Sequence, residues 1–246
     1  MSDPASVRAR LVDRAVRAGL TGEALVRFTE RVEQMAAGEL RQLDPATFRG
    51  PAAVQPDRTT CGSSSLVMSR MINDPAFAMY VMTGYDPASD DTDSRTGAER
   101  FAREALTMHE RTNAGTDRGG DRQLRWPQSL GTQPWALANE MSATGGSGVP
   151  GTTYHVDAVR LEDRGSSFDR IVEASRAGHA VPVYVGNSLR PAHVVLVTAA
   201  DGERLTVYQP ANGRTVHVTR DQWQRNQLTP LLGWSRPWAI VVPTAD

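Results

Sequence analysis

Residues 55–68 read QPDRTTCGSSSLVM, and this stretch decides how the chain is expected to fold. Its first half is turn-prone, and its second half begins a run of small and apolar residues that is typical of a buried helix. The only cysteine of the chain, Cys61, falls at the junction. A helix start presents unpaired N–H groups and the positive end of the helix dipole, and both favour a thiolate over a thiol. Its position makes Cys61 a candidate nucleophile.

A histidine that can act on Cys61 is expected at the head of a strand far downstream. His193 precedes the apolar run VVLVT, so it begins a strand whose rigid backbone can aim an imidazole at the thiol. We expect His193 to remove the proton of Cys61 and later to deliver it to the leaving group. The other histidines fall in patterns that favour core or surface positions: His109, His155, His179 and His217.

Amide side chains supply the remaining parts of an acyl-transfer site. Gln55, six residues before Cys61, can fold back and offer its amide to an oxyanion beside the sulfur. After His193 the chain is expected to make a hairpin through residues 200–202, which returns Gln209 or Asn212 to the imidazole. An amide oxygen at either position suits the group that orients a catalytic histidine. Asn212 also fits a simple turn, because it lies in Ala-Asn-Gly.

The ordered set Gln55, Cys61-Gly62, His193 and Gln209-Pro210 resembles the papain-like cysteine peptidase superfamily, and more closely its bacterial C39-like branch. The resemblance covers roughly residues 50–243. It implies a two-lobed fold with Cys61 on a helical lobe, His193 on an antiparallel β lobe, and substrate in the cleft between them. It also implies an oxyanion hole made by Gln55 and the N–H of Cys61. The sequence departs from the family at Gln209, where an Asp or Asn is usual.

The same resemblance extends to the segment LGTQPW at residues 130–135, which is similar to one found between the two halves of such domains. Gly62 and Trp135 are the expected substrate-binding residues. Loops at 86–95, 115–125 and 142–153 are expected to flank the cleft and to set specificity. The substrate itself is expected to be a peptide or protein, cleaved at a peptide or isopeptide bond through a thioester.

The order of the predicted elements indicates an α+β protein. Helices are expected first and strands later, and this segregation argues against alternating α/β units. The predicted helices cover 61–73, 75–83, 96–113 and 168–176, and the predicted strands cover 152–159, 180–185, 193–198, 205–208, 215–218 and 238–242.

Residues 1–45 are expected to form a helical extension to a catalytic domain of residues 46–246. Apolar residues at helical spacing, interrupted by GLTG at 19–22, predict two amphipathic helices. Their exposed positions are mostly Arg and Glu, which favours a solvated face over a basic binding surface. The extension can be a packed element, a cover for the cleft or an arm that binds a protein partner.

Composition limits the classes of function. The net charge is −1 and all 27 basic residues are arginine, so we expect no binding to nucleic acid or to a membrane surface. A single cysteine excludes a cysteine-rich zinc site, and the aspartates at 90–93 lack the pattern of a calcium loop. No metal or cofactor is predicted. The sequence shows neither a signal-peptide pattern nor a membrane-spanning stretch, which predicts a cytoplasmic protein or export by an unconventional route.

Two other functions remain open at the level of sequence. The same acyl-enzyme could pass to an amine or deamidate glutamine, as in a transglutaminase or deamidase acting as an effector or toxin. The absence of lysine suits such a protein, although a genome rich in arginine codons explains it more simply. The fold could also be catalytically inactive and serve for binding, with the N-terminal helices contacting the partner.

Overall fold

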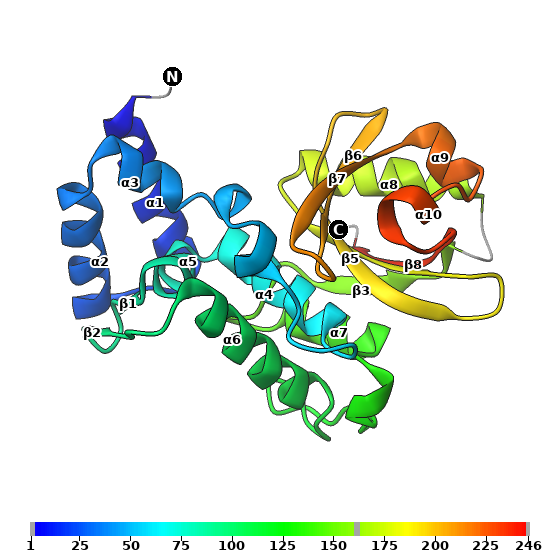
Figure 1. Ribbon diagram of the computed structural model, residues 1–246. Helices are drawn as coiled ribbons and strands as arrows, with labels where there is room; N and C mark the ends of the chain where they lie inside the picture. Colours follow the sequence, from blue (N-terminus) through cyan, green and yellow to red (C-terminus); the bar gives the residue numbers. More distant parts are fainter. Residues whose placement is uncertain (1–2, 160–162, 245–246) are drawn as a thin grey trace.

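The computed structural model describes residues 3–159 and 163–244, and it places a group of helices beside a single large sheet (Figure 1). The helices are α1 (Pro4–Arg17), α2 (Gly22–Gln34), α3 (Ala37–Gln42), α4 (Cys61–Asn73), α5 (Pro75–Thr83), α6 (Gly97–Thr112), α7 (Pro134–Ser142), α8 (Arg164–Arg176), α9 (Arg220–Gln224) and α10 (Thr229–Leu232). Short 3₁₀ turns are η1 (Pro45–Thr47), η2 (Gly50–Ala53) and η3 (Gln128–Leu130). The strands are β1 (Tyr85–Asp86), β2 (Asp91–Thr92), β3 (Tyr154–Asp157), β4 (Val181–Gly186), β5 (Pro191–Ala200), β6 (Arg204–Gln209), β7 (Arg214–Thr219) and β8 (Arg236–Pro243).

The chain is therefore an α+β protein, as its sequence predicts, with helices first and a six-stranded sheet later. The strand order is β3-β8-β4-β5-β6-β7, and every neighbouring pair is antiparallel. Each strand predicted after residue 150 is present. The predicted helices at 61–73 and 75–83 also begin and end at the expected residues.

The two faces of the sheet have different coverings because side chains alternate along each strand. One face includes Tyr184, Val194 and Leu196, and these pack against the apolar sides of α4, α6 and α7. The opposite face includes Val195 and Val197, and it packs against α8 and the short helices near the C-terminus. The sheet is buried on both faces, so its central strands are almost continuously apolar.

Helix α4 lies between the helical group and the sheet, in the middle of the molecule (Figure 1). Ten of its residues, from Cys61 to Met71, are buried, so the helix has no solvated face. Gly62 and the serines at 63–65 are small enough for neighbouring elements to approach closely, and contacts with α5, α6, α7 and β5 use this space. This packing fixes the position of the helix start.

The N-terminal segment forms three helices instead of the two predicted. The break at 19–22 occurs as expected between α1 and α2, and a further short helix, α3, follows. Apolar residues of these helices, including Phe28 and Val32, form a core with Ala76 and Met79 of α5. Residues 1–45 are thus packed against the rest of the protein through α5.

The sequence predicts an exposed loop for the acidic segment at 86–94, but part of it belongs to a small hairpin. The hairpin strands, β1 and β2, have two residues each and pair antiparallel. Asp93 of this segment accepts hydrogen bonds from the side chain of Arg95 and forms an ion pair with Arg103. The carboxylate is therefore compensated by arginines. None of the helices in the described residues is long and apolar enough to cross a membrane.

Candidate functional site

Cys61 is the first residue of α4, and its side chain is only 7% exposed. The preceding loop is shaped by Asp57, whose Oδ1 accepts hydrogen bonds from the backbone N–H groups of Thr59 and Thr60. Such an Asx turn gives the chain its sharp entry into the helix. The helix start predicted from the sequence is confirmed, and the sulfur lies where the unpaired N–H groups begin.

Burial of Cys61 opposes the thiolate that a helix start favours. The backbone N–H groups of Cys61, Gly62 and Val194 point to the sulfur and act to lower its pKa. Burial acts in the opposite direction and is the largest effect, so the pKa of the Cys61 thiol is raised above its ordinary value. The negative charge of Asp57 raises it further. The N–H groups at the helix start favour the thiolate as predicted, but desolvation outweighs them.

His193 lies near the start of β5, where the sequence places it, and is 8% exposed. By strand alternation it belongs to the face of the sheet that carries Val195. Its Nε2 makes a hydrogen bond with Oε1 of Gln209, the last residue of β6. The Nε2 of Gln209 in turn donates to the carbonyl oxygen of Leu232 at 3.1 Å. The predicted pair of His193 and Gln209 is therefore formed.

These bonds assign the imidazole tautomer. Because the Gln209 amide nitrogen is used on the Leu232 carbonyl, the Gln209 oxygen faces the imidazole and accepts a proton there. The Nε2 of His193 must carry that proton, which leaves Nδ1 with a free lone pair. Nδ1 has no hydrogen-bond partner within residues 3–159 and 163–244. The ring is thus held with Nδ1 able to accept a proton.

Cys61 and His193 belong to different faces of the sheet: Cys61 packs in the core that contains Val194, whereas strand alternation assigns His193 to the face of Val195. Val194, whose N–H points to the sulfur, is the next residue after His193. Pairing of β5 with β6 begins only at Leu196 opposite Tyr208, so the first residues of β5 lie beyond the ladder. Pro210, which follows β6, has no N–H to extend it. The sulfur lies near the backbone of Val194 in this part of β5.

No hydrogen bond joins the Cys61 thiol to the His193 imidazole in the described part of the chain. The pKa of His193 is lowered by burial, which outweighs the opposing effect of the Gln209 hydrogen bond. A raised thiol pKa and a lowered imidazole pKa both favour neutral groups.

Gln55 is close to the site but does not point its amide N–H₂ at the sulfur. Its backbone N–H donates to the Pro210 carbonyl at 2.9 Å, which ties the loop before α4 to the end of β6. Its side-chain Nε2 donates to the Asp57 carbonyl, and its Oε1 is buried without a partner. The structure brings Gln55 into the loop that carries Cys61. It does not place the side chain as an oxyanion donor.

Asn212 does not orient the imidazole. Its Oδ1 accepts a hydrogen bond from the backbone N–H of Arg214 at 3.0 Å, within the turn between β6 and β7. The side chain is exposed. Of the two amides left open by the sequence, Gln209 contacts His193 and Asn212 is a turn residue.

Gly62 lies against Thr132, in the segment that connects η3 to α7. A Cβ added at Gly62 would come 2.7 Å from the Thr132 Cβ, closer than real contacts allow. The Thr132 carbonyl also accepts a hydrogen bond from the Tyr184 hydroxyl at 2.9 Å, which holds the segment on the sheet. Gly62 thus allows close packing beside Cys61, and Thr132 occupies the space expected for substrate backbone.

We expect Gly62→Ala to lower the free energy of unfolding by about 1–3 kcal/mol, because the new methyl group would overlap the buried side chain of Thr132. Gly38→Ala is the matched control, since a Cβ at this exposed helical glycine meets nothing within 4 Å. The control is expected to be neutral or stabilising by up to about 1 kcal/mol. Urea unfolding of both variants measures their free energies of unfolding. Equal values would show that the Thr132 side chain moves aside at little cost.

Trp135 begins the first turn of α7 and is 36% exposed. Its ring packs edge-on against Trp126, with 5.8 Å between centroids. It is three residues from Thr132, which lies against Gly62, but within the described residues its ring contact is with Trp126 and not with Cys61 or His193. Its assignment to substrate binding stays a prediction.

Sequence patterns did not single out several residues around Cys61. Tyr184 and Thr132 lie beside it, and the carboxylate of Asp57 affects its pKa. Asp57 had a recognisable signal, because an aspartate two residues before a threonine is typical of an Asx turn. Tyr184 had none, since it reads as one apolar residue in a buried strand.

Replacing Gln209 with Glu should shift the pH dependence of any activity. In the wild-type protein, burial lowers the pKa of His193, so the base is lost only at a pH below the usual histidine range. A carboxylate beside Nε2 stabilises the imidazolium, and the acid limb of kcat/KM should therefore move to higher pH.

Asn212→Asp is the matched control for this experiment. It adds the same charge in the exposed turn three residues away, without contact to the imidazole. Its acid limb should stay at the wild-type position. An unchanged limb in Gln209→Glu, with the fold intact by circular dichroism, would contradict the assigned contact.

Within the described ranges, no group of three or more His, Cys, Asp or Glu residues is arranged to hold a metal ion. No known protein-family model and no curated protein matches the chain.

Proposed function

We propose that the protein is a papain-like cysteine hydrolase that cleaves a peptide or isopeptide bond of a peptide or protein substrate. The observation that carries the proposal is the assigned tautomer of His193. Its Nε2–H is held by Gln209 and its Nδ1 is free, while the next residue in β5 directs its N–H at the sulfur of Cys61. A free ring nitrogen is what a general base needs, and the proposal supposes that it reaches the Cys61 thiol when substrate is bound.

In the proposed reaction the Cys61 thiol and the His193 imidazole both start as neutral groups. Nδ1 of His193 takes the proton from the Cys61 thiol as the sulfur forms a bond to the substrate carbonyl carbon. The bond from that carbon to the leaving nitrogen breaks, and the amine takes the proton from Nδ1. Water then attacks the thioester with the same imidazole as base, which regenerates the thiol and releases the acid. In this scheme proton transfer accompanies attack, because burial disfavours a thiolate before substrate binds.

The oxyanion would be stabilised mainly by backbone N–H groups at the start of α4. Those of Cys61 and Gly62 already point toward the sulfur. Gln55 would join them if its side chain rotated away from the Asp57 carbonyl, a movement favoured by its unpartnered Oε1. Catalytic hydrogen bonds commonly shorten or realign only when substrate is bound.

In this proposal the helical group and the sheet are the two lobes of a papain-like fold. The segment around Gly62, Thr132 and Trp135 then lies on the helical side of the substrate. The N-terminal helices remain a candidate surface for a protein partner. In this proposal the protein acts in the cytoplasm, or outside the cell after export by an unconventional route.

Mass spectrometry of a proteome or peptide library treated with the protein tests the proposal. New peptide termini that depend on Cys61 would support hydrolysis. Conversion of glutamine to glutamate, or cross-linked peptides, would instead identify a deamidase or transglutaminase that uses the same acyl-enzyme. No change in any peptide at high protein concentration would favour a binding module without activity.

A further inference from the structure

A second buried histidine, His109, lies on α6 next to the loop that leads to Cys61. It is 5% exposed. Its Nε2 is 3.1 Å from the carbonyl oxygen of Gln128 and 3.5 Å from the hydroxyl oxygen of Thr59. Its Nδ1 is 3.2 Å from the side-chain nitrogen of Asn113, one turn later on the same helix. The ring is therefore held from both sides.

These partners fix the protonation of the ring. A carbonyl oxygen only accepts, so Nε2 of His109 carries a proton and donates it to Gln128. The Asn113 side-chain nitrogen also donates to the backbone carbonyl of His109 at 2.8 Å, which turns its N–H₂ toward the ring. Nδ1 is then the acceptor. His109 therefore donates from Nε2 and is held in one orientation.

Two groups contact Nε2 of His109: the Gln128 carbonyl and the Thr59 hydroxyl. They belong to the two segments that flank the start of α4. Thr59 lies in the Asp57 turn, where its backbone N–H and its hydroxyl bind Asp57 Oδ1 at 2.7 and 2.8 Å. Two residues later the chain reaches Cys61. His109 thus contacts the segment that delivers the sulfur.

The other segment runs from Gln128 through η3 to Thr132, which packs on Gly62. The two segments also meet directly, since a Cβ at Gly131 would be 3.5 Å from the Thr59 carbonyl oxygen. The His109 side chain hydrogen-bonds to the 128–132 segment and contacts the Asp57 turn. It belongs to α6, which is itself packed on α4.

We propose that His109 is a positioning residue for Cys61. By donating to the Gln128 carbonyl and contacting the Thr59 hydroxyl, it holds the Asp57 turn and the 128–132 segment at a fixed separation around the first turn of α4. The proposal rests on the proposed function for its effect on turnover, but its effect on the thiol is independent of that function. Small displacements of a nucleophile are costly because attack requires aligned atoms.

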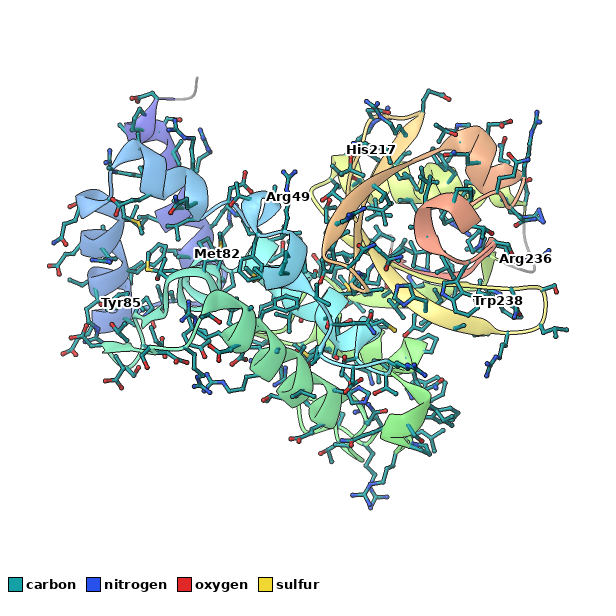
Figure 2. The ribbon with its side chains drawn as sticks, in the orientation of Figure 1. Arg49, Met82, Tyr85, His217, Arg236 and Trp238 are labelled. Carbon is teal, nitrogen blue, oxygen red and sulfur yellow. The ribbon has the colours of Figure 1, made fainter. Side chains whose placement is uncertain are left out.

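Three variants test the role of the Nε2 donor. His109→Leu removes it, whereas His109→Gln retains an amide N–H₂ near the same place. We expect His109→Leu to lower kcat about 10-fold or more with little change in KM, and to change the rate of Cys61 alkylation by iodoacetamide severalfold. His109→Gln should restore most of both values. His217→Leu is the matched control, since His217 is exposed on β7, on the far side of the molecule from α6 (Figure 2).

Thr59→Val keeps the proposal testable if His109→Leu does not fold. It preserves the shape of the side chain while removing the hydroxyl that meets His109 and Asp57. It should change alkylation in the same direction, and the double variant should show less than the sum of the two effects on a free-energy scale. A folded His109→Leu variant with the wild-type alkylation rate and the wild-type kcat would overturn the proposal. A folded His109→Gln variant that loses as much kcat as His109→Leu would overturn it as well.

The alkylation measurement separates this proposal from the proposed function. If Cys61 proves not to be a nucleophile in any reaction, the dependence of its labelling rate on His109 still reports whether the ring positions the thiol. If turnover depends on Cys61 but labelling and kcat ignore His109, the proposed function stands and the positioning role is wrong.

Discussion

Cys61→Ala is expected to abolish turnover, with kcat lowered by at least about 10⁴-fold. The sulfur is the atom that forms the thioester, and the chain has no second cysteine to replace it. The substitution removes one buried atom at a helix start whose position is set by the packing of α4. Its thermal unfolding midpoint should therefore remain close to that of the wild type, and both activity and melting temperature need to be measured.

Cys61→Ser provides the matched control for shape. Its hydroxyl keeps the size and polarity of the thiol, but a serine oxygen is far harder to deprotonate and needs a stronger base than a neutral imidazole without a carboxylate partner. We expect it to be nearly as inactive as Cys61→Ala. Substantial activity in Cys61→Ala would exclude a thioester and leave the buried cysteine as a packing residue.

His193→Ala is expected to lower kcat about 10³-fold, because general base and general acid catalysis are both removed. The residual reaction should depend on pH through the thiol alone. Since burial raises the pKa of Cys61, the remaining rate should rise steadily as the pH is increased toward the thiol's raised pKa. The acid limb due to His193 should disappear.

The control for this variant is His217→Ala, which removes an exposed imidazole from the outer strand β7. It should retain the wild-type rate and pH profile. Removing His193 also leaves Gln209 Oε1 in a buried position with only a long contact to the Ala211 N–H, so a stability loss of about 1–3 kcal/mol is expected. A folded His193→Ala with wild-type kcat would contradict its role as base.

Much of the fold could be predicted from local sequence. The α4 and α5 boundaries follow from small and apolar residues and from Asp74-Pro75, where the carboxylate caps α5 at Ala76 and Phe77. The central strands follow from β-branched runs. The short helices α9 and α10 and the β1–β2 hairpin were missed because four- and five-residue elements carry too little periodicity to register.

The site was less predictable because its properties depend on long-range packing. The contact between His193 and Gln209 follows from a hairpin and was predictable. The raised pKa of Cys61 was not predictable, since it depends on elements distant in sequence that bury the sulfur. His109 looked like one polar residue of a charged helix, and its contacts with Thr59 and Gln128 exist only in the folded protein.

The most direct test of the account is acid-quenched mass spectrometry of the protein during reaction with the activated ester p-nitrophenyl acetate. The account predicts a burst of p-nitrophenolate close to one per chain and an acetyl group on the Cys61 peptide that hydroxylamine removes. His193→Ala should slow both the burst and the loss of the acetyl group. Acetylation of a different residue, or an equal burst from Cys61→Ala, would contradict Cys61 as the nucleophile.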